Sequence, residues 1–443
     1  MKFVAQSTPT AQSPARQATL GTRQSEAAGP LATMMMIYLV VAVGRIGDII
    51  PPIEFLPLAK IVAGIAILIA ALNWAKLSQA SVWSLPPVRL TLLIMALVTV
   101  SIVFSVWRQE TLHMITGTVL SITVGTLLMI KSARNWHAVR RLLLACVLSA
   151  LVLALSVEIT RVSGRAGFTR DLDPNGFAFI LVGLLPIVVA FAFVSRRIAR
   201  LSFACASFWV IIEILRTGSR GGLLGLLCAI ALMIVLLPAR RRGQLLPKPS
   251  KTTILARITI LLMASLIVWN TIPDSARSRL STIVHPYSGY NTNLNDPTGR
   301  FTIWLQTLPL SLRRPWGWGA GAFPAVDGLY AGGRYKATHN MYLEALIELG
   351  FPGLTLFLAT IVSSFRHLFR EAFAQLEPTQ HDALERRIFA RTLISSLSAL
   401  CVSGFFLSEF YSQVTWTVVI LACLVGRSSI TKYDVIQPTN AAQ

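Results

Sequence analysis

Long apolar runs, separated by short polar or basic stretches, dominate the chain from residue 31 onwards. A transmembrane α-helix needs roughly 20 consecutive and mostly apolar residues, and the runs repeatedly reach this length. The pattern predicts an all-α, polytopic integral membrane protein with about 12 spans. The expected spans start near Leu31, Phe55, Val88, Leu112, Val139, Gly176, Ile198, Gly221, Thr253, Asn340, Ile388 and Glu409.

These runs divide the chain into five segments. Residues 1–30 are rich in Ser, Thr, Gln and Ala and lack the layout of a cleaved signal, so they predict a disordered cytoplasmic tail. Residues 31–272 would hold the first nine expected spans and residues 339–428 the last three, before a second cytoplasmic tail at 429–443. Residues 273–338 predict one long loop at the opposite, outer face, in which we expect short helices.

The charge balance narrows the choice of partners. The chain has 40 Lys and Arg against 19 Asp and Glu, a net charge of +21, and 5 cysteines. The basic residues form no continuous stripe and lie between apolar runs, so we expect anionic membrane lipid and no nucleic acid as partner. One alternate set of loops, with both tails, holds most of them, which predicts that both termini are cytoplasmic. The cysteines show no paired spacing, so the sequence indicates neither disulfides nor a metal knuckle.

A second set of cationic and titratable residues lies at the outer face, in front of three expected spans that run inward. Arg161 and Arg165 precede the first, Arg216 and Arg220 the second, and His339 the third. Helix N-termini carry unsatisfied N–H groups and a partial positive charge, which suits phosphate. A guanidinium group matches phosphate oxygens and is costly near hydrocarbon without a partner. The pattern predicts an anion site at the outer face.

Each of these arginines also has a structural interpretation. Any of them would serve as an interfacial residue whose charge reaches the lipid headgroups. Arg216 follows a glutamate by three residues and would pair with it on one helical face. Arg220 is flanked by Ser219, Gly221 and Gly222, and the two glycines would let a ligand approach the backbone. This favours ligand binding for Arg220 and leaves both interpretations open for Arg216.

His339 and Asn340 stand at the start of an expected span. An imidazole with an ordinary pKa of about 6.5 can take a proton from a hydroxyl group near neutral pH. The alternative for His339 is a cap or a hydrogen-bond donor. Glu344 and Glu348 follow on one helical face, where they would pair with arginine or orient His339.

Two further groups have both a structural and a functional interpretation. Asp171 and Asp173 form an Asp-x-Asp pair that could hold a divalent cation, but Pro-Asn-Gly follows directly. That context predicts a helix cap at Asp173, and the arginines nearby oppose a cation, so no metal site is expected. Trp316, Trp318 and Tyr330 would stack on sugar rings or serve as ordinary interfacial aromatic residues.

Four motifs, taken in order, resemble the O-antigen ligase and polymerase superfamily over roughly residues 160–425. They are Ser219-Arg220-Gly221-Gly222, Gly299-Arg300 with Trp304, Pro315-Trp-Gly317-Trp-Gly319-Ala-Gly321-Ala-Phe323, and His339-Asn340-x-Tyr342-Leu343-x-x-x-Ile347-Glu348-x-Gly350-x-x-Gly353. The resemblance implies a membrane glycosyltransferase with its active site at the periplasmic face of a Gram-negative inner membrane. Such ligases move O-antigen from undecaprenyl pyrophosphate to lipid A-core in lipopolysaccharide assembly, with inversion and without a metal or other cofactor.

On this resemblance, Arg220 and Arg300 hold the pyrophosphate and His339 is the base for the acceptor hydroxyl. Arg161 and Arg165 match no motif and are included by position. An O-antigen polymerase and a protein O-oligosaccharyltransferase remain alternatives, since they need the same pyrophosphate site. An anion or lipid transporter would also carry buried arginines, but it should show paired motifs in two halves, which the sequence lacks.

Overall fold

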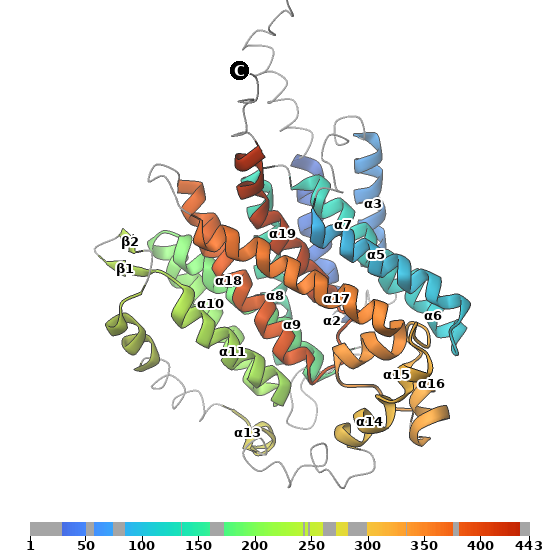
Figure 1. Ribbon diagram of the computed structural model, residues 1–443. Helices are drawn as coiled ribbons and strands as arrows, with labels where there is room; N and C mark the ends of the chain where they lie inside the picture. The colour runs from blue at the N-terminus through green and yellow to red at the C-terminus, as the bar shows by residue number, and fades with distance from the viewer. Residues whose placement is uncertain are drawn as a thin grey trace, which may run out of the picture.

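The computed structural model describes residues 29–49, 57–73, 85–133, 135–159, 172–241, 244–246, 249–259, 272–281, 299–333, 335–374 and 381–434. Over these residues the protein is a bundle of α-helices with one short β-hairpin (Figure 1). Six helical segments are long and apolar enough to cross a membrane. The predicted polytopic helical membrane fold is therefore confirmed, whereas the count of twelve spans stays a prediction.

The spans follow the apolar runs of the sequence. The six segments are Pro86–Val103, Arg108–Ser132, Trp136–Ser156, Pro174–Val194, Arg197–Arg216 and Met341–Phe373, and the shorter apolar helices are Gly29–Ala42, Leu58–Leu72, Arg220–Leu236 and Gln413–Gly426. The expected span near Thr253 is helical over 251–259, and its remainder lies outside the described residues.

The labelled elements run in chain order as follows. They are α2 (Ile46–Ile49), α3 (Leu58–Leu72), α5 (Pro86–Val100), the 3-10 helix η3 (Ser101–Val103), α6 (Arg108–Met114), the π-helix η4 (Ile115–Val119), α7 (Leu120–Ser132), α8 (Trp136–Ile159), α9 (Pro174–Val194), α10 (Arg197–Arg216), α11 (Arg220–Leu236), β1 (Ala239–Arg241), β2 (Gln244–Leu246), α13 (Asp274–Ser281), α14 (Arg300–Thr307), α15 (Leu310–Arg313), α16 (Phe323–Val326), the π-helix η6 (Asp327–Gly332), α17 (Met341–Phe373), α18 (His381–Gly404) and α19 (Gln413–Asp434). Strands β1 and β2 pair antiparallel.

Two expected boundaries were wrong. Helix α18 begins at His381 instead of near Ile388, because its first turns are charged and the sequence pattern makes them look like a loop. Helix α19 begins at Gln413 instead of near Glu409, which leaves residues 405–412 as a loop between the two helices.

Helix α9 lies at the centre of the bundle. It is apolar all round, and nearly all of its residues from Pro174 to Phe191 are buried. A helix without a polar face is stable only when neighbours cover it on every side. Helices α8, α10, α11 and α18 contact α9, and α17 crosses α18 and packs on α5 and α19 (Figure 1). This core fixes the directions of the helices whose ends form the site.

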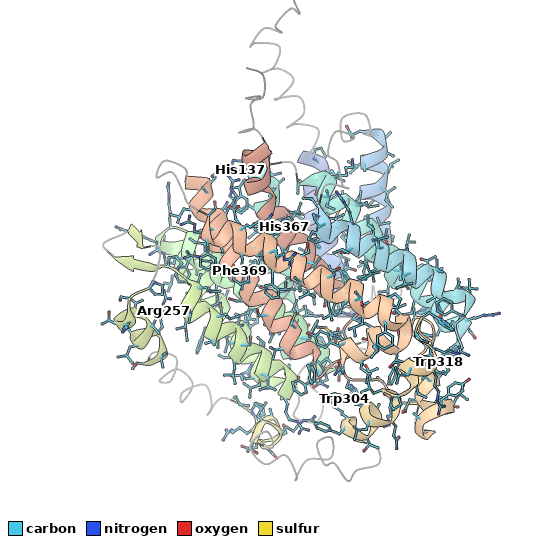
Figure 2. The ribbon with its side chains drawn as sticks, viewed as in Figure 1. His137, Arg257, Trp304, Trp318, His367 and Phe369 are labelled. Atoms are coloured by element: carbon cyan, nitrogen blue, oxygen red, sulfur yellow. The ribbon has the colours of Figure 1, made fainter. Side chains whose placement is uncertain are left out.

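The short helices α13 to α16 lie together at one end of the bundle, where α9, α11 and α17 begin (Figure 1). We call this the site end. Trp304 and Trp318 lie there, whereas His137 and His367 lie at the opposite end (Figure 2). The short helices fall within the predicted loop 273–338, as expected. Its placement on the outer side of a membrane stays a prediction, and the tails lie mostly outside the described residues.

Helix α17 is broken near its start at Gly350, where φ is 70° and ψ is −167°. A Cβ atom at this position would lie 2.1 Å from the carbonyl oxygen of Pro315, so only glycine fits. The glycine-rich turn after Pro315 fills the break: Trp318 N donates to Ile347 O at 2.9 Å, and Phe351 N donates to Pro315 O at 2.8 Å. The turn is thereby fixed to α17.

Candidate active site

Helices α9, α11 and α17 each begin with a capping side chain at the site end. Asp173 Oδ1 accepts the amide N–H three residues later at 2.8 Å, and Ser219 Oγ does the same at 3.2 Å. Asn340 Oδ1 accepts two amide N–H groups at 3.0 and 3.1 Å. The predicted cap at Asp173 is confirmed. Because the caps occupy these amides, an anion bound here would depend mainly on side chains.

The loop 405–412 connects the starts of α9 and α17. His339 N donates to Ser408 Oγ at 2.8 Å. On the other side, the Oε1 atom of Glu409 lies 3.4 Å from the position that a Cβ atom on Gly176 would occupy. The first turns of α9 and α17 are therefore neighbours, although their starts at Pro174 and Met341 are 167 positions apart in the sequence (341 − 174).

Helix α14 brings a third arginine-bearing segment to the same place. Trp304 Nε1 donates to Thr338 O at 2.7 Å, and its ring meets the ring of Phe405 edge-on at 5.5 Å between centroids. These contacts fix α14 beside the residue before His339. Arg300, the first residue of α14, is thereby placed close enough to His339 to act on its charge.

Arg300 lies half-buried in a positively charged environment. Its Nε atom is buried without a hydrogen-bond partner among the described residues. Burial lowers the pKa of Arg300 to about 10, and the charges of Arg220 and Arg279 act in the same direction, against that of Asp173. A buried donor without an acceptor is costly, and so are cations held together. An anionic ligand would relieve both costs.

Helix α13 supplies Arg279, which the sequence did not single out. Ala276 of this helix lies 3.1 Å (Cα) from the position that a Cβ atom on Gly218 would occupy, and φ of Gly218 is +62°. Ile272 and Ala276 also pack on Leu215 at the end of α10. Helix α13 thus docks on the turn that precedes Arg220. The spacing of Ala276 and Leu280 is the only signal in the sequence for this apolar face.

His339 is half-buried and has an unusual backbone conformation, with φ of 48°. The pKa of its imidazole is lowered to about 4, mainly by burial. The charges of Arg300 and Lys336 contribute to this lowering, and that of Asp173 opposes it. The imidazole is therefore neutral at pH 7 and retains a nitrogen lone pair for a proton. The hydrogen bond from its backbone to Ser408 holds it in place.

Glu409 was also missed by sequence reasoning. Burial raises its pKa to about 8, a hydrogen bond from Ser412 lowers it, Asp173 raises it, and Arg45 lowers it. Glu409 and Asp173, which come from two different segments, therefore lie close together, and burial keeps Glu409 largely protonated at pH 7. The sequence placed Glu409 inside a helix, which hid its position in the loop.

One comparison with known proteins found a family match. Residues 205–358 match the family model described as O-antigen ligase. This part of the chain belongs to the O-antigen ligase family. A search of curated proteins gave no match. The matched region includes Arg220, Arg300 and His339, and the family implies a glycosyltransferase-type enzyme.

Not every residue that the sequence indicated for ligand binding is available to a ligand. Arg216 Nη1 pairs with Glu213 Oε1 at 2.9 Å, so the structural interpretation of this arginine holds. Glu213 is fully buried and also accepts from Trp209 Nε1 at 3.1 Å. Arg161 and Arg165 lie outside the described residues.

Gly221 and Gly222 lie in the first turn of α11, where a helix start was expected. A Cβ atom on residue 222 would lie 2.6 Å from the Cβ atom of Ala178 on α9, and one on residue 221 would lie 3.2 Å from the Cβ atom of Phe406. The two glycines therefore let α11 approach its neighbours closely, and helix packing is a sufficient reason for them.

Of the three aromatic residues proposed for sugar contact, Trp318 is 4% exposed. Its ring lies 4.7 Å from that of Tyr330 and 4.3 Å from the guanidinium carbon of Arg314, and its Nε1 donates to Leu310 O at 3.2 Å. The expectation for Trp318 was therefore wrong, because protein atoms already cover it. Trp316 is 55% exposed and Tyr330 is 44% exposed, and both remain candidates.

Among the described residues, the two glutamates of α17 pair with neither arginine nor His339. Glu348 accepts the amide N–H groups of Gly321 at 2.7 Å and Phe323 at 3.1 Å, and the hydroxyl of Tyr411 at 2.8 Å. Glu344 accepts an amide N–H from the loop 405–412 at 3.1 Å. Both carboxylates fasten loops to α17. No three His, Cys, Asp or Glu side chains in the described part of the chain lie close enough together to hold a metal ion.

Proposed function

We propose that this protein is an O-antigen ligase, which moves O-antigen polysaccharide from undecaprenyl pyrophosphate to lipid A-core. The single observation that supports this most strongly is the crowding of Arg220 and Arg279 around Arg300, which itself lies near His339 and has a buried Nε atom without a hydrogen-bond partner among the described residues. Cations near a membrane normally lie beside an anion. A pyrophosphate at this point would accept several charge-assisted hydrogen bonds from guanidinium groups.

The arginines would act mainly on the leaving group. As the bond between the anomeric carbon and the pyrophosphate oxygen breaks, negative charge grows on the pyrophosphate. Fixed guanidinium groups stabilise that charge without reorganisation, which lowers the barrier. Attack by the acceptor oxygen from the opposite side of the sugar would invert the anomeric centre. The reaction in this proposal needs no metal or other cofactor.

His339 would receive the proton of the acceptor hydroxyl. The pKa of His339 is about 4, which makes it a weak base. A bound pyrophosphate brings negative charge to Arg300 and so raises the pKa of His339 towards the range of an effective base. In this proposal donor binding prepares the base, and the acceptor oxygen attacks as His339 takes its proton.

The membrane placement is part of the same proposal. The protein would lie in the bacterial inner membrane with both termini in the cytoplasm and the site end at the periplasmic face. A polymerase or a protein O-oligosaccharyltransferase would use the same donor site with another acceptor. For a transporter, the break at Gly350 would have to line a pathway, but the turn after Pro315 fills it with backbone hydrogen bonds.

Reconstitution tests the proposal directly. Purified protein would be mixed with undecaprenyl-pyrophosphate glycan and lipid A-core, with and without EDTA, and the lipopolysaccharide followed by gel shift. We expect a shift that survives EDTA and disappears in His339→Ala. His137→Ala, which alters an exposed histidine at the opposite end of the bundle, should leave the shift unchanged. Longer lipid-linked glycans without a shift would identify a polymerase, and no product from any acceptor would refute a transferase.

A further inference from the structure

A concave surface lies at the start of α6, and none of Arg220, Arg279 and Arg300 lines it. Its volume is about 540 Å³, and it is lined by Trp107, Gln109, Glu110, Leu112, His113 and Thr116. The residues at 109, 112, 113 and 116 form one stripe along the helix, because three and four residues make about one turn. Trp107 closes the stripe at its N-terminal end. We call this surface the α6 groove.

The lining of the α6 groove has the chemistry that recognises a saccharide. It combines one exposed indole, which can cover the C–H face of a sugar ring, with an amide, a carboxylate, an imidazole and a hydroxyl for ring hydroxyls. A second groove, of about 510 Å³, has an apolar lining that includes Val402, Phe405 and Phe406. The contrast favours a polar ligand over an acyl or isoprenoid chain as occupant of the α6 groove.

The α6 groove also lies at a depth that a polar ligand can reach. Arg108, Glu110 and His113 fall in the first two turns of the candidate span Arg108–Ser132. Charged side chains are costly in hydrocarbon, so these turns belong at the level of the headgroups or in water. The π-helix Ile115–Val119 follows directly, a rare element that often occurs at functional sites.

Hydrogen bonds tie the α6 groove to the glycine-rich turn. Thr111 Oγ1 donates to Ala320 O at 2.7 Å, and Thr111 and Ser105 share a hydrogen bond of 2.8 Å. A Cβ atom on Gly321 would lie 3.1 Å from Cγ of Glu110. The wall of the groove therefore cannot move independently of residues 320–321.

The same turn is tied to the candidate active site. Gly321 N donates to Glu348 Oε2 at 2.7 Å, and Tyr411 OH donates to the same oxygen at 2.8 Å. Tyr411 lies in the loop 405–412, whose Ser408 accepts the amide N–H of His339 at 2.8 Å. A continuous set of contacts thus fixes the α6 groove relative to His339, as a subsite for a long substrate requires.

We propose that the α6 groove is a saccharide-binding subsite that holds a sugar of one substrate while another part of that substrate reacts at His339. This rests on the proposed function, because it assumes that the substrates are glycans. The sugar belongs either to the core oligosaccharide of the acceptor or to the glycan of the donor. Both have the same recognising chemistry, and kinetics separates them.

Substitutions in the α6 groove test the proposal. In the reconstituted reaction, Trp107→Ala and Gln109→Ala should raise KM about tenfold for one substrate and change kcat little, because the groove binds without taking part in the reaction. Trp107→Phe keeps an aromatic face and should retain most of the affinity. Arg108→Gln, an exposed neighbour that does not line the groove, should leave both KM values unchanged.

The KM that rises identifies the source of the sugar. A rise for lipid A-core assigns the α6 groove to the acceptor, and a rise for the lipid-linked glycan assigns it to the donor. Unchanged KM values for both in Trp107→Ala and Gln109→Ala, with the His339→Ala variant inactive, would overturn the subsite and leave the proposed function intact.

A binding measurement keeps the test independent of turnover. Lipid-free core oligosaccharide and donor glycan released from its lipid would each be added to detergent-solubilised protein and followed by saturation-transfer NMR. We expect transfer to one of them in the unaltered protein and its loss in Trp107→Ala. Equal transfer in both proteins, or none to either sugar, would overturn the subsite even if the ligase reaction itself failed.

Discussion

The site end contains two polar centres, and they differ in the hydrogen bonds that their buried atoms make. The anchor centre consists of Glu348 and its donors Gly321, Phe323 and Tyr411. The cationic centre consists of Arg220, Arg279, Arg300 and His339. Glu348 is 2% exposed, and both of its oxygens accept hydrogen bonds. In the cationic centre like charges face one another, and the Nε atom of Arg300 is buried without an acceptor.

This difference distinguishes a centre that stabilises the fold from a centre that is suited to bind a ligand. A buried carboxylate with three donors stabilises one arrangement of the chain and needs no ligand. Cations held close together repel one another, and this repulsion destabilises the protein until an anion binds. Both centres are rich in charged or polar side chains, so composition alone would not distinguish them. The buried Nε atom of Arg300, which has no acceptor among the described residues, does.

The largest expected effect is on catalysis at the cationic centre. Arg220→Lys keeps the charge but replaces the planar fork by a point charge, and we expect turnover to fall on the order of 10³-fold in the reconstituted reaction. Arg216→Lys is the matched control, because a lysine can still pair with Glu213. Near-normal turnover in Arg220→Lys would argue against a guanidinium clamp on the donor.

The two centres should respond oppositely when stability is measured. Glu348→Ala leaves buried amide and hydroxyl donors without an acceptor, at a cost of about 2–3 kcal/mol, and should lower the midpoint of thermal unfolding in detergent. Arg300→Met removes one of several crowded cations and should leave that midpoint unchanged or raise it. Equal losses of stability in both variants would remove the distinction between the centres.

Local signals in the sequence predicted much of this architecture. The apolar runs predicted the helices, and Asp173, Ser219 and Asn340 were expected at helix starts because a capping residue acts on amides two or three positions away. Such contacts lie within one segment, so a sequence displays them. The broken start of α17 at Gly350 was not predicted, because the turn that fills the break comes from another segment.

The errors share a physical cause. Arg279 and Glu409 join the site only because α13 docks before α11 and because the loop 405–412 passes α9, and neither contact leaves a pattern along the chain. Gly222, which was assigned to a ligand, faces Ala178, and close packing and close ligand approach both require a missing side chain. The residue type therefore indicated that another group comes close to this position, but not which group it is.

Arg279 tests how far the cationic centre extends. If it contributes to binding the donor, Arg279→Gln should raise the KM for the lipid-linked donor about tenfold and leave the KM for the acceptor unchanged. Arg277→Gln is the control on the same helix, because Arg277 lies 3.6 Å from Asp274 and donates to Ile272 O at 3.0 Å. Equal effects of both substitutions would mean that α13 acts by packing alone.

The smallest expected effect is a pair of opposite pH shifts that identify His339 as the base. Protonated His339 cannot accept a proton, so kcat/KM should fall as the pH drops through the pKa of His339 in the free enzyme, which is about 4. Lys336→Gln removes a cation, raises that pKa and should move the acid limb to higher pH. Asp173→Asn keeps a side chain that can cap α9 but removes a negative charge, so it lowers the pKa and should move the limb to lower pH. The donor's own ionisation is the same in every variant, and the comparison therefore isolates the enzyme. Shifts of the same sign, or none, would mean that another group limits turnover in acid.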